Sequence, residues 1–204
     1  AVCKGKFMFH FGSVSMTDEP ARSATLFAAR YAREHGLTVS YDPNLRRNLW
    51  SDEQTARQYI REGLNLCDVA KLSDEECTFL CGDGEIDALG HRLLAEHPNL
   101  KLLFVTCGAG GSYAFCGSRM AFVPGFSVKI ADTTGAGDAF VGVLYQILRR
   151  GGLREAYSPA ELEQLLTFGN AVGALSVQRY GAIPAIPTLA ETESFLHAQG
   201  LLGA

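Results

Sequence analysis

The chain has 204 residues, of which 47% are hydrophobic and 20% are charged, and its formal net charge is −4 at pH 7. These proportions are typical of one globular domain with a sizeable core, and we expect a single domain over residues 1–204. The acidic balance argues against a nucleic-acid partner, and without a long apolar run or a basic leader we expect no membrane partner and a cytoplasmic location.

The first half of the chain alternates apolar runs typical of strands with amphipathic patterns typical of helices. We expect strands at residues 7–11, 37–41, 69–72 and 102–106. We expect helices from the cap, acid and first-turn proline at 18–20 to just before Gly36, at 51–64, from the capping residues 73–76 onward, and at 86–96. This alternation predicts a three-layer α/β fold, with helices on both faces of a mostly parallel sheet.

The second half of the chain opens with a predicted β-hairpin. Residues 113–115 and 120–122 are β-like and flank the turn Cys116-Gly117-Ser118. Helices at about 138–150, 160–178 and 188–198 follow. No repeat or linker marks a domain boundary.

The cysteines and histidines do not predict a metal centre. The cysteines contain no C-x-x-C pair, and His91 and His97 lack the i, i+4 spacing of two ligands on one helix face. Most cysteines lie inside apolar runs, so we expect reduced core residues rather than disulfides or zinc ligands. The six cysteines are Cys3, Cys67, Cys77, Cys81, Cys107 and Cys116.

Residues 132–138 predict an anion-binding helix start. Gly135 and Gly137 carry no Cβ, and the first turn of the helix that follows leaves backbone N–H groups without helical acceptors. Such groups bind phosphate, aided by the helix dipole. Asp138 lies at the same place and could take a proton from an attacking hydroxyl. The alternative is a capping role, which is common for aspartate at a helix start.

The string Asp132-Thr133-Thr134-Gly135-Ala136-Gly137-Asp138 resembles the signature of the PfkB-type, or ribokinase-like, carbohydrate kinases. Three further loops, at the expected strand ends, resemble segments of that family in the same chain order. The resemblance implies a ribokinase-like fold that is incomplete at the N-terminus, because relatives carry earlier strands and a small β lid. It also implies that Asp138 is the catalytic base and that Gly135, Ala136 and Gly137 hold the transferred phosphoryl group.

Two of these loops follow the second and third predicted strands. Asp42-Pro43-Asn44-Leu45-Arg46 resembles the family's loop facing phosphate and sugar, which implies a contact through Asn44. Lys71 could neutralise a phosphate of ATP. The residues alone are also explained by a proline turn with a capping aspartate and by a solvated lysine at a strand end.

Ser73-Asp74-Glu75-Glu76 predicts a capping box, in which Ser73 and Glu76 satisfy each other's backbone N–H groups. The resemblance implies a second role for Glu76, which is to help hold Mg²⁺ and its waters. Ser73 stands where the family usually has asparagine, so the resemblance assigns this metal role to Glu76 and not to Ser73.

The turn Thr106-Cys107-Gly108-Ala109-Gly110-Gly111 resembles the family's nucleotide-binding turn, which implies that Thr106, Gly108 and Gly111 approach ATP. A plain strand-to-hairpin turn would also explain these glycines. Asn170 resembles a position that lines the adenine pocket, and a buried asparagine without a partner would be costly.

The resemblance further implies a site for a monovalent cation, K⁺, formed mostly by backbone carbonyls. The residues at the matching positions are Asp132, Thr134, Ser176, Arg179, Gly181 and Ala185.

Taken together, the resemblance implies ATP-dependent phosphorylation of a primary sugar hydroxyl, with a small-molecule sugar and ATP as partners. The segment His10-Phe11-Gly12-Ser13-Val14-Ser15 is most similar to bacterial fructokinases. We also expect a homodimer of the complete protein. The alternatives are a kinase for 2-keto-3-deoxygluconate, ribose or a nucleoside, and a non-catalytic nucleotide-binding fragment or remnant. No P-loop, dinucleotide-binding or nucleophile-elbow motif occurs.

Overall fold

The structure is a computed structural model that describes residues 5–201. Its contacts divide the chain into two compact units. Unit 1 contains residues 5–105, 115–119 and 153–156, and unit 2 contains residues 106–114, 120–152 and 157–201. Cys3, which the sequence predicts to be a reduced core residue, lies outside the described residues.

Strands of unit 1 form the parallel part of the sheet. β1 (Met8–Gly12) pairs in parallel with β2 (Thr38–Asp42), and β2 pairs in parallel with β3 (Val69–Ser73). β4 (Leu102–Thr106) is almost wholly buried, as its apolar sequence predicts. The described strands follow the order β1-β2-β3-β4-β5-β6. The α/β fold with a mostly parallel sheet is thereby confirmed.

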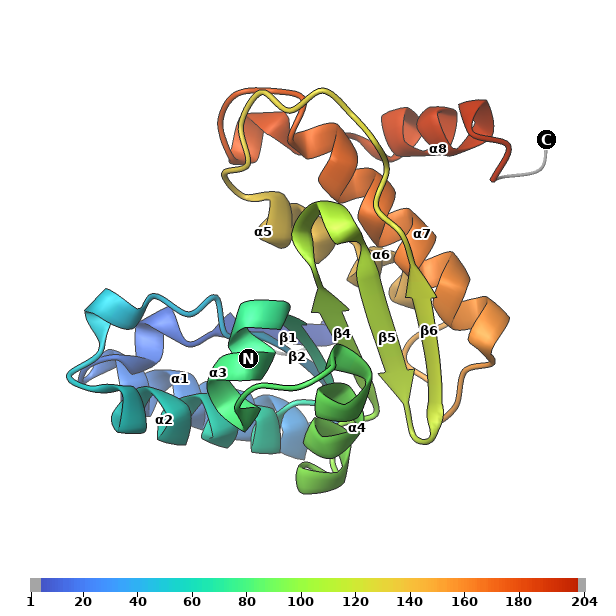
Figure 1. The fold of residues 1–204 in the computed structure, drawn as a ribbon. Coiled ribbons are helices and arrows are strands. Elements are labelled where there is room, and N and C mark those ends of the chain that lie inside the picture. The colour runs from blue at the N-terminus through green and yellow to red at the C-terminus, as the bar shows by residue number, and fades with distance from the viewer. Residues whose placement is uncertain (1–4, 202–204) are drawn as a thin grey trace. The chain divides into compact units, whose positions relative to one another are not determined.

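The expected hairpin is also confirmed. It consists of β5 (Ser112–Cys116) and β6 (Arg119–Val123), which run in opposite directions (Figure 1). These two strands make the sheet mixed rather than wholly parallel.

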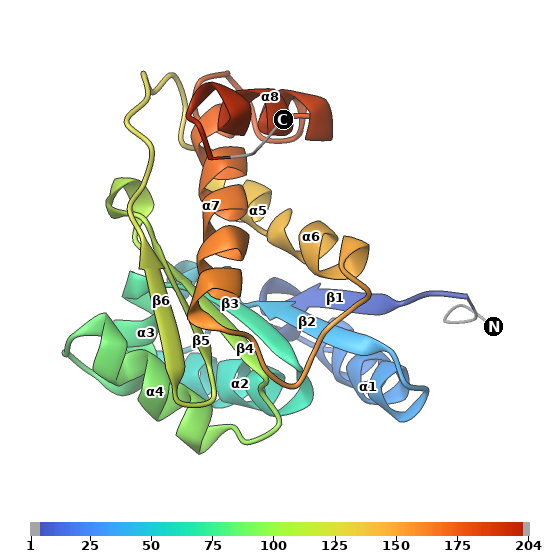
Figure 2. The same cartoon turned by 90° about the vertical axis from the view of Figure 1, so that its right-hand side faces the viewer.

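Four helices belong to unit 1: α1 (Ala21–Glu34), α2 (Glu53–Leu66), α3 (Asp74–Cys81) and α4 (Ile86–Glu96). Figures 1 and 2 show α1, α2 and α4 along the same side of the strands. The Asp52 carboxylate accepts the Thr55 N–H at 2.8 Å and so begins α2. Large side chains from the strands and helices fill the core between them, including Tyr41, Ile60 and Phe104.

The start of α1 differs from the prediction. Pro20 is the N-cap residue and the helix begins at Ala21, so the proline is not in the first turn. The Asp18 carboxylate accepts the N–H of Glu19, its immediate neighbour, and therefore does not cap the helix. Instead a Glu19 carboxylate oxygen accepts the Ser23 N–H at 3.2 Å.

Unit 2 is built around α7 (Pro159–Ser176), which begins with a capping box between Ser158 and Glu161. α8 (Leu189–Ala198) packs against α7, and the cluster between them contains Phe168, Val172 and Leu196. No helix in the part of the chain that the structure describes is long and apolar enough to cross a membrane.

The helix predicted at 138–150 is divided into two, α5 (Ala136–Phe140) and α6 (Val143–Arg149). Between them the N–H of Gly142 donates to the Ala139 carbonyl, three residues back, instead of four. The N–H groups of Leu144 and Tyr145 also donate three residues back. The chain is therefore tightened locally into 3₁₀-type turns.

The cysteines that the structure describes are free thiols. Cys67, Cys77 and Cys116 are buried, as their apolar surroundings predict. Among residues 5–201, no group of three or more histidine, cysteine, aspartate or glutamate side chains could hold a metal ion.

Candidate functional site

Unit 2 contains a cavity of about 430 Å³ that is lined by six of its sequence-predicted site residues. Four segments line it: the turn after β4, the segment after β6, the start of α5 and one face of α7. The lining residues are Thr106, Gly108, Ala109, Gly111, Gly125, Phe126, Ser127, Val128, Ile130, Thr133, Ala136, Gly137, Phe140, Asn170, Gly173, Ala174 and Val177. Apolar side chains dominate this wall, which is typical of a small-molecule site.

The turn after β4 is shaped by close backbone packing. Gly111 has a φ of +117°, and a Cβ atom there would lie 2.2 Å from the Val123 carbonyl oxygen at the end of β6. The Cys107 N–H donates to the Gly111 carbonyl at 2.8 Å and closes the turn. Glycine at 111 is therefore required by the hairpin itself, and the same turn presents Thr106 and Gly108 to the cavity.

Asn170 lies on the cavity wall, with all its side-chain polar groups engaged by the protein. Its Oδ1 accepts the Ser112 hydroxyl at 2.7 Å. Its Nδ2 donates to the carbonyl oxygens of Val123 at 3.0 Å and Pro124 at 3.3 Å. The residue is 9% exposed, and these bonds explain how a buried amide is accommodated.

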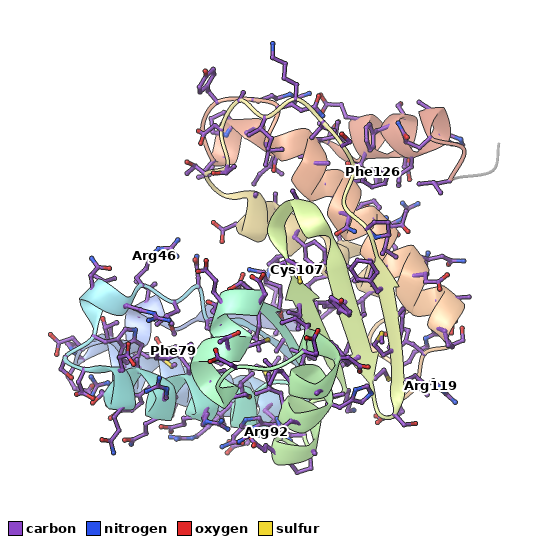
Figure 3. The ribbon with its side chains drawn as sticks, viewed as in Figure 1. Arg46, Phe79, Arg92, Cys107, Arg119 and Phe126 are labelled. Atoms are coloured by element: carbon purple, nitrogen blue, oxygen red, sulfur yellow. The ribbon has the colours of Figure 1, made fainter. Side chains whose placement is uncertain are left out.

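Several lining residues were not singled out in the sequence. Gly173, Ala174 and Val177 follow Asn170 by three, four and seven positions, which is the spacing of one helix face. Small residues at this spacing were the signal that could have found them. Phe126 lies on the segment after β6 (Figure 3), and its only sequence signal is its position just beyond the hairpin.

The start of α5 carries the predicted anion-binding turn. Gly135 is the N-cap residue, with a φ of +78°, and a Cβ atom there would lie 3.0 Å from the Ala182 Cβ. Ala136 and Gly137 line the cavity, and no acceptor among residues 5–201 pairs with the Gly137 N–H. Asp138 follows in the first turn; its side chain is exposed and lines neither cavity described in this section.

The residues predicted to surround a cation are partly brought together by Asp132. One Asp132 carboxylate oxygen accepts the N–H and hydroxyl of Thr134, at 2.9 and 2.7 Å, and the other accepts the Gly181 N–H at 3.0 Å. These bonds lower the Asp132 pKa because they stabilise its charged form. The Ser176 hydroxyl donates to the Gly173 carbonyl, and Arg179 forms an ion pair with Glu191. Ala185 is buried at the end of a 3₁₀ turn.

Unit 1 contains a second, more polar cavity of about 310 Å³. Its walls come from the loop after β2, the end of β3 and the start of α3. The lining residues are Asn44, Leu45, Arg46, Arg47, Lys71, Ser73, Glu75 and Glu76. Arg46 is exposed and lies at the outer edge of the loop (Figure 3).

Asp42, which the sequence placed only in a turn, organises this cavity. One of its oxygens accepts the Lys71 ammonium at 3.1 Å and the other accepts the Asn44 N–H at 3.1 Å. Asn44 has a φ of +48°, a left-handed conformation that this short-range bond supports. Burial raises the pKa of Asp42 to about 6, although Lys71 opposes the shift. The signal in the sequence was a carboxylate directly after a buried strand.

Glu76 makes the predicted capping box and one further bond. Its Oε2 accepts the Ser73 N–H at 2.8 Å, and the Ser73 hydroxyl accepts the Glu76 N–H at 3.1 Å. Its Oε1 accepts the Leu45 N–H at 2.7 Å and ties α3 to the loop after β2. Each oxygen still has a lone pair for a water molecule, so the site fits Mg²⁺ held through water and not by a direct carboxylate cage.

Nine of the predicted site residues thus line one of two cavities, each of which lies within a single unit. Asn44, Lys71 and Glu76 share the cavity of unit 1. The cavity of unit 2 receives the nucleotide turn, Asn170 and the phosphoryl turn.

Comparisons with known proteins find related sequences and folds. The profile described as pfkB family carbohydrate kinase matches residues 3–189. Fructokinase-2 of Solanum lycopersicum is 43% identical over 190 residues, which cover 93% of this chain and 57% of that protein. Fructokinase of Solanum tuberosum is 44% identical over 190 residues, covering 93% and 56%. The chain therefore spans less than two thirds of the length of these curated relatives.

Solved structures show the same likeness. A double mutant of fructokinase from Vibrio cholerae O395, with fructose, ADP and potassium ion bound, has a TM-score of 0.82 at 35% identity, covering 93% of this chain and 60% of that one. Fructokinase from Xylella fastidiosa with bound ATP has a TM-score of 0.82 at 33% identity, covering 95% and 62%.

Proposed function

Because the chain belongs to the pfkB family of carbohydrate kinases, we propose that it forms the ATP-binding and phosphoryl-transfer part of a fructokinase. The reaction would transfer the γ-phosphoryl group of ATP to a primary hydroxyl of fructose. The observation that carries the proposal is the cavity of unit 2, where the 106–111 turn, the start of α5 and Asn170 line one space. Fructokinases related at above 40% identity support the choice of sugar.

In this proposal, residues at the start of α5 carry out the phosphoryl transfer. The Gly137 N–H, which has no acceptor among residues 5–201, would bind an oxygen of the transferred phosphoryl group. Asp138, one residue further, would take the proton of the attacking hydroxyl. Its exposure is compatible with access for a sugar, since a base must reach the hydroxyl it deprotonates.

The cavity of unit 1 would serve the phosphates. Lys71 forms an ion pair with Asp42, and Asn44 lines the same cavity. Glu76 would hold Mg²⁺ through water, and the ion would offset the negative charge of the ATP phosphates. With both Glu76 oxygens fixed by backbone N–H groups, the carboxylate is already oriented for this contact.

A monovalent cation would lie near Asp132 and Thr134, where the Asp132 carboxylate accepts hydrogen bonds from the N–H groups of Thr134 and Gly181. The potassium ion in the Vibrio cholerae structure supports K⁺ as the ion to test. The homodimer of the complete protein and the cytoplasmic location stay predictions.

The test is a coupled assay of ADP release with purified chain, ATP, Mg²⁺ and fructose. We expect ADP release that depends on fructose and exceeds that with ribose or 2-keto-3-deoxygluconate. ATP binding without sugar-dependent ADP release would support the alternative of a non-catalytic nucleotide-binding fragment. A preference for another sugar would replace fructose as the substrate.

A further inference from the structure

Ser112 is a completely buried polar residue at the first position of β5, and it does not line the cavity of unit 2. Its hydroxyl donates to Asn170 Oδ1 at 2.7 Å. A buried hydroxyl is retained at a cost unless it is hydrogen-bonded, so this single contact accounts for its presence.

Two backbone carbonyl oxygens select the orientation of the Asn170 amide, and Ser112 pairs with the amide oxygen that results. With Oδ1 toward Ser112, Nδ2 meets the carbonyl oxygens of Val123 and Pro124. The opposite orientation would place Oδ1 against those two carbonyl oxygens, which can only accept hydrogen bonds. Ser112 and the two carbonyls therefore hold the amide in one orientation.

The fixed amide joins two walls of the cavity. On one side, Asn170 lines the cavity together with Gly173 and Ala174, which lie on the same face of α7. On the other side, Pro124 is followed directly by the lining residues Gly125 and Phe126. Gly125 packs so closely on the turn after β4 that a Cβ atom would lie 2.5 Å from the Ala109 carbonyl oxygen. A shift of the segment after β6 would therefore also disturb the turn.

We propose that Ser112 is a positioning residue for the nucleotide cavity and acts through Asn170. This inference rests on the proposed function and deepens it. It attributes part of the affinity for ATP to a residue that does not line the nucleotide cavity. The role of Asn170 then differs from recognition of the base, because its polar atoms are already bonded to the protein. Its contribution is to fix the distance between α7 and the segment after β6.

The first experiment measures ATP affinity of Ser112→Ala by titration calorimetry in the presence of Mg²⁺, at a temperature where parent and variant are both folded. Removing the hydroxyl leaves Asn170 Oδ1 buried and unpaired, which loosens the amide. We expect the Kd for ATP to rise roughly 5- to 20-fold. Thr192→Val is the matched control, because Thr192 is also buried in unit 2 and donates its hydroxyl to the Thr188 carbonyl, away from the cavity lining.

The second experiment is a double-mutant cycle with Asn170→Ala. If Ser112 acts only through Asn170, adding Ser112→Ala to Asn170→Ala causes no further rise in Kd. Thermal unfolding of every variant is measured beside the titrations. A purely structural role for Ser112 would lower the melting temperature, as we expect for Thr192→Val, and leave the Kd unchanged.

The outcomes separate this inference from the proposed function. Failure of the parent chain to bind ATP would overturn both. ATP binding by the parent with an unchanged Kd in Ser112→Ala would overturn the positioning role alone. An additive effect in the double variant would show that Ser112 acts independently of Asn170, and would overturn the stated route. If Asn170→Ala does not fold, the comparison of Ser112→Ala with Thr192→Val still decides.

Discussion

At the scale of single residues, the proposed catalytic base is exposed, whereas the carboxylates that shape the cavity of unit 1 are buried. Asp138 is exposed in the first turn of α5. Asp42 and Glu76 are buried, and each of their carboxylate oxygens accepts a hydrogen bond from a backbone N–H or from the Lys71 ammonium. A group that meets a substrate must be reachable, whereas a group that builds a loop must be held.

Asp138→Asn is expected to lower fructose-dependent turnover by roughly 10²- to 10⁴-fold, the usual range for loss of a general base. The change is isosteric, so the Kd for ATP should stay close to that of the parent. Steady-state kinetics and ATP titration of the same preparation measure the two effects. Turnover at the parental rate would show that Asp138 only stabilises the start of α5.

Glu76→Gln separates a capping role from a magnesium role. The glutamine carbonyl can accept one of the two backbone N–H bonds, so capping alone predicts a loss of about 1 kcal/mol in unfolding free energy and a normal Mg²⁺ requirement. Loss of the negative charge predicts a raised Mg²⁺ requirement in the kinase assay. Magnesium titrations of parent and variant that superimpose would contradict the metal role.

At the scale of elements, local sequence signals placed most helices and strands, and tertiary packing changed two of them. The apolar pattern over 138–150 predicted one helix, but the chain tightens at Gly142 and forms α5 and α6. The proline at position 20 predicted a first-turn position, but it became the N-cap residue. Helix ends depend on which hydrogen bonds are available in the fold, and periodicity does not report them.

Gly111→Ala tests whether the turn after β4 is set by packing. Its left-handed φ and the 2.2 Å approach of the Val123 carbonyl oxygen leave no room for a Cβ atom. We expect a loss of more than about 2 kcal/mol in unfolding free energy. Chemical denaturation measures it, and Gly152→Ala is the control, because Gly152 has a φ of +99° with nothing within 4 Å. Equal losses in the two variants would assign the effect to φ alone.

At the scale of the whole molecule, the unfolding free energy is expected to depend on pH because of the buried Asp42 carboxyl. Its pKa is raised from 3.8 to about 6 by burial, so the folded state binds this proton more tightly than the unfolded state. The stabilising contribution is therefore fully present below about pH 4 and is lost as the pH rises through about 6.

We expect the unfolding free energy of the parent to gain up to about 3 kcal/mol relative to Asp42→Asn as the pH falls from 7 to 4. Only the pH dependence of the difference is predicted, because the variant also removes the partner of Lys71. Urea denaturation of both proteins across this range measures it. A difference that does not change with pH would contradict the raised pKa.

The sequence by itself determined the α/β class, the order of strands and helices, and the loops at the strand ends that carry Asn44, Lys71 and Gly108. Those features depend on neighbours in the chain: apolar periodicity, caps, and glycine before a helix. Only the tertiary structure decided that Asn170 is saturated by Ser112 and two carbonyls, that Asp42 holds Lys71, and that Gly111 faces Val123. The reason is physical: burial and hydrogen-bond pairing are set by residues distant in the chain that the fold brings into contact, and no local pattern records them.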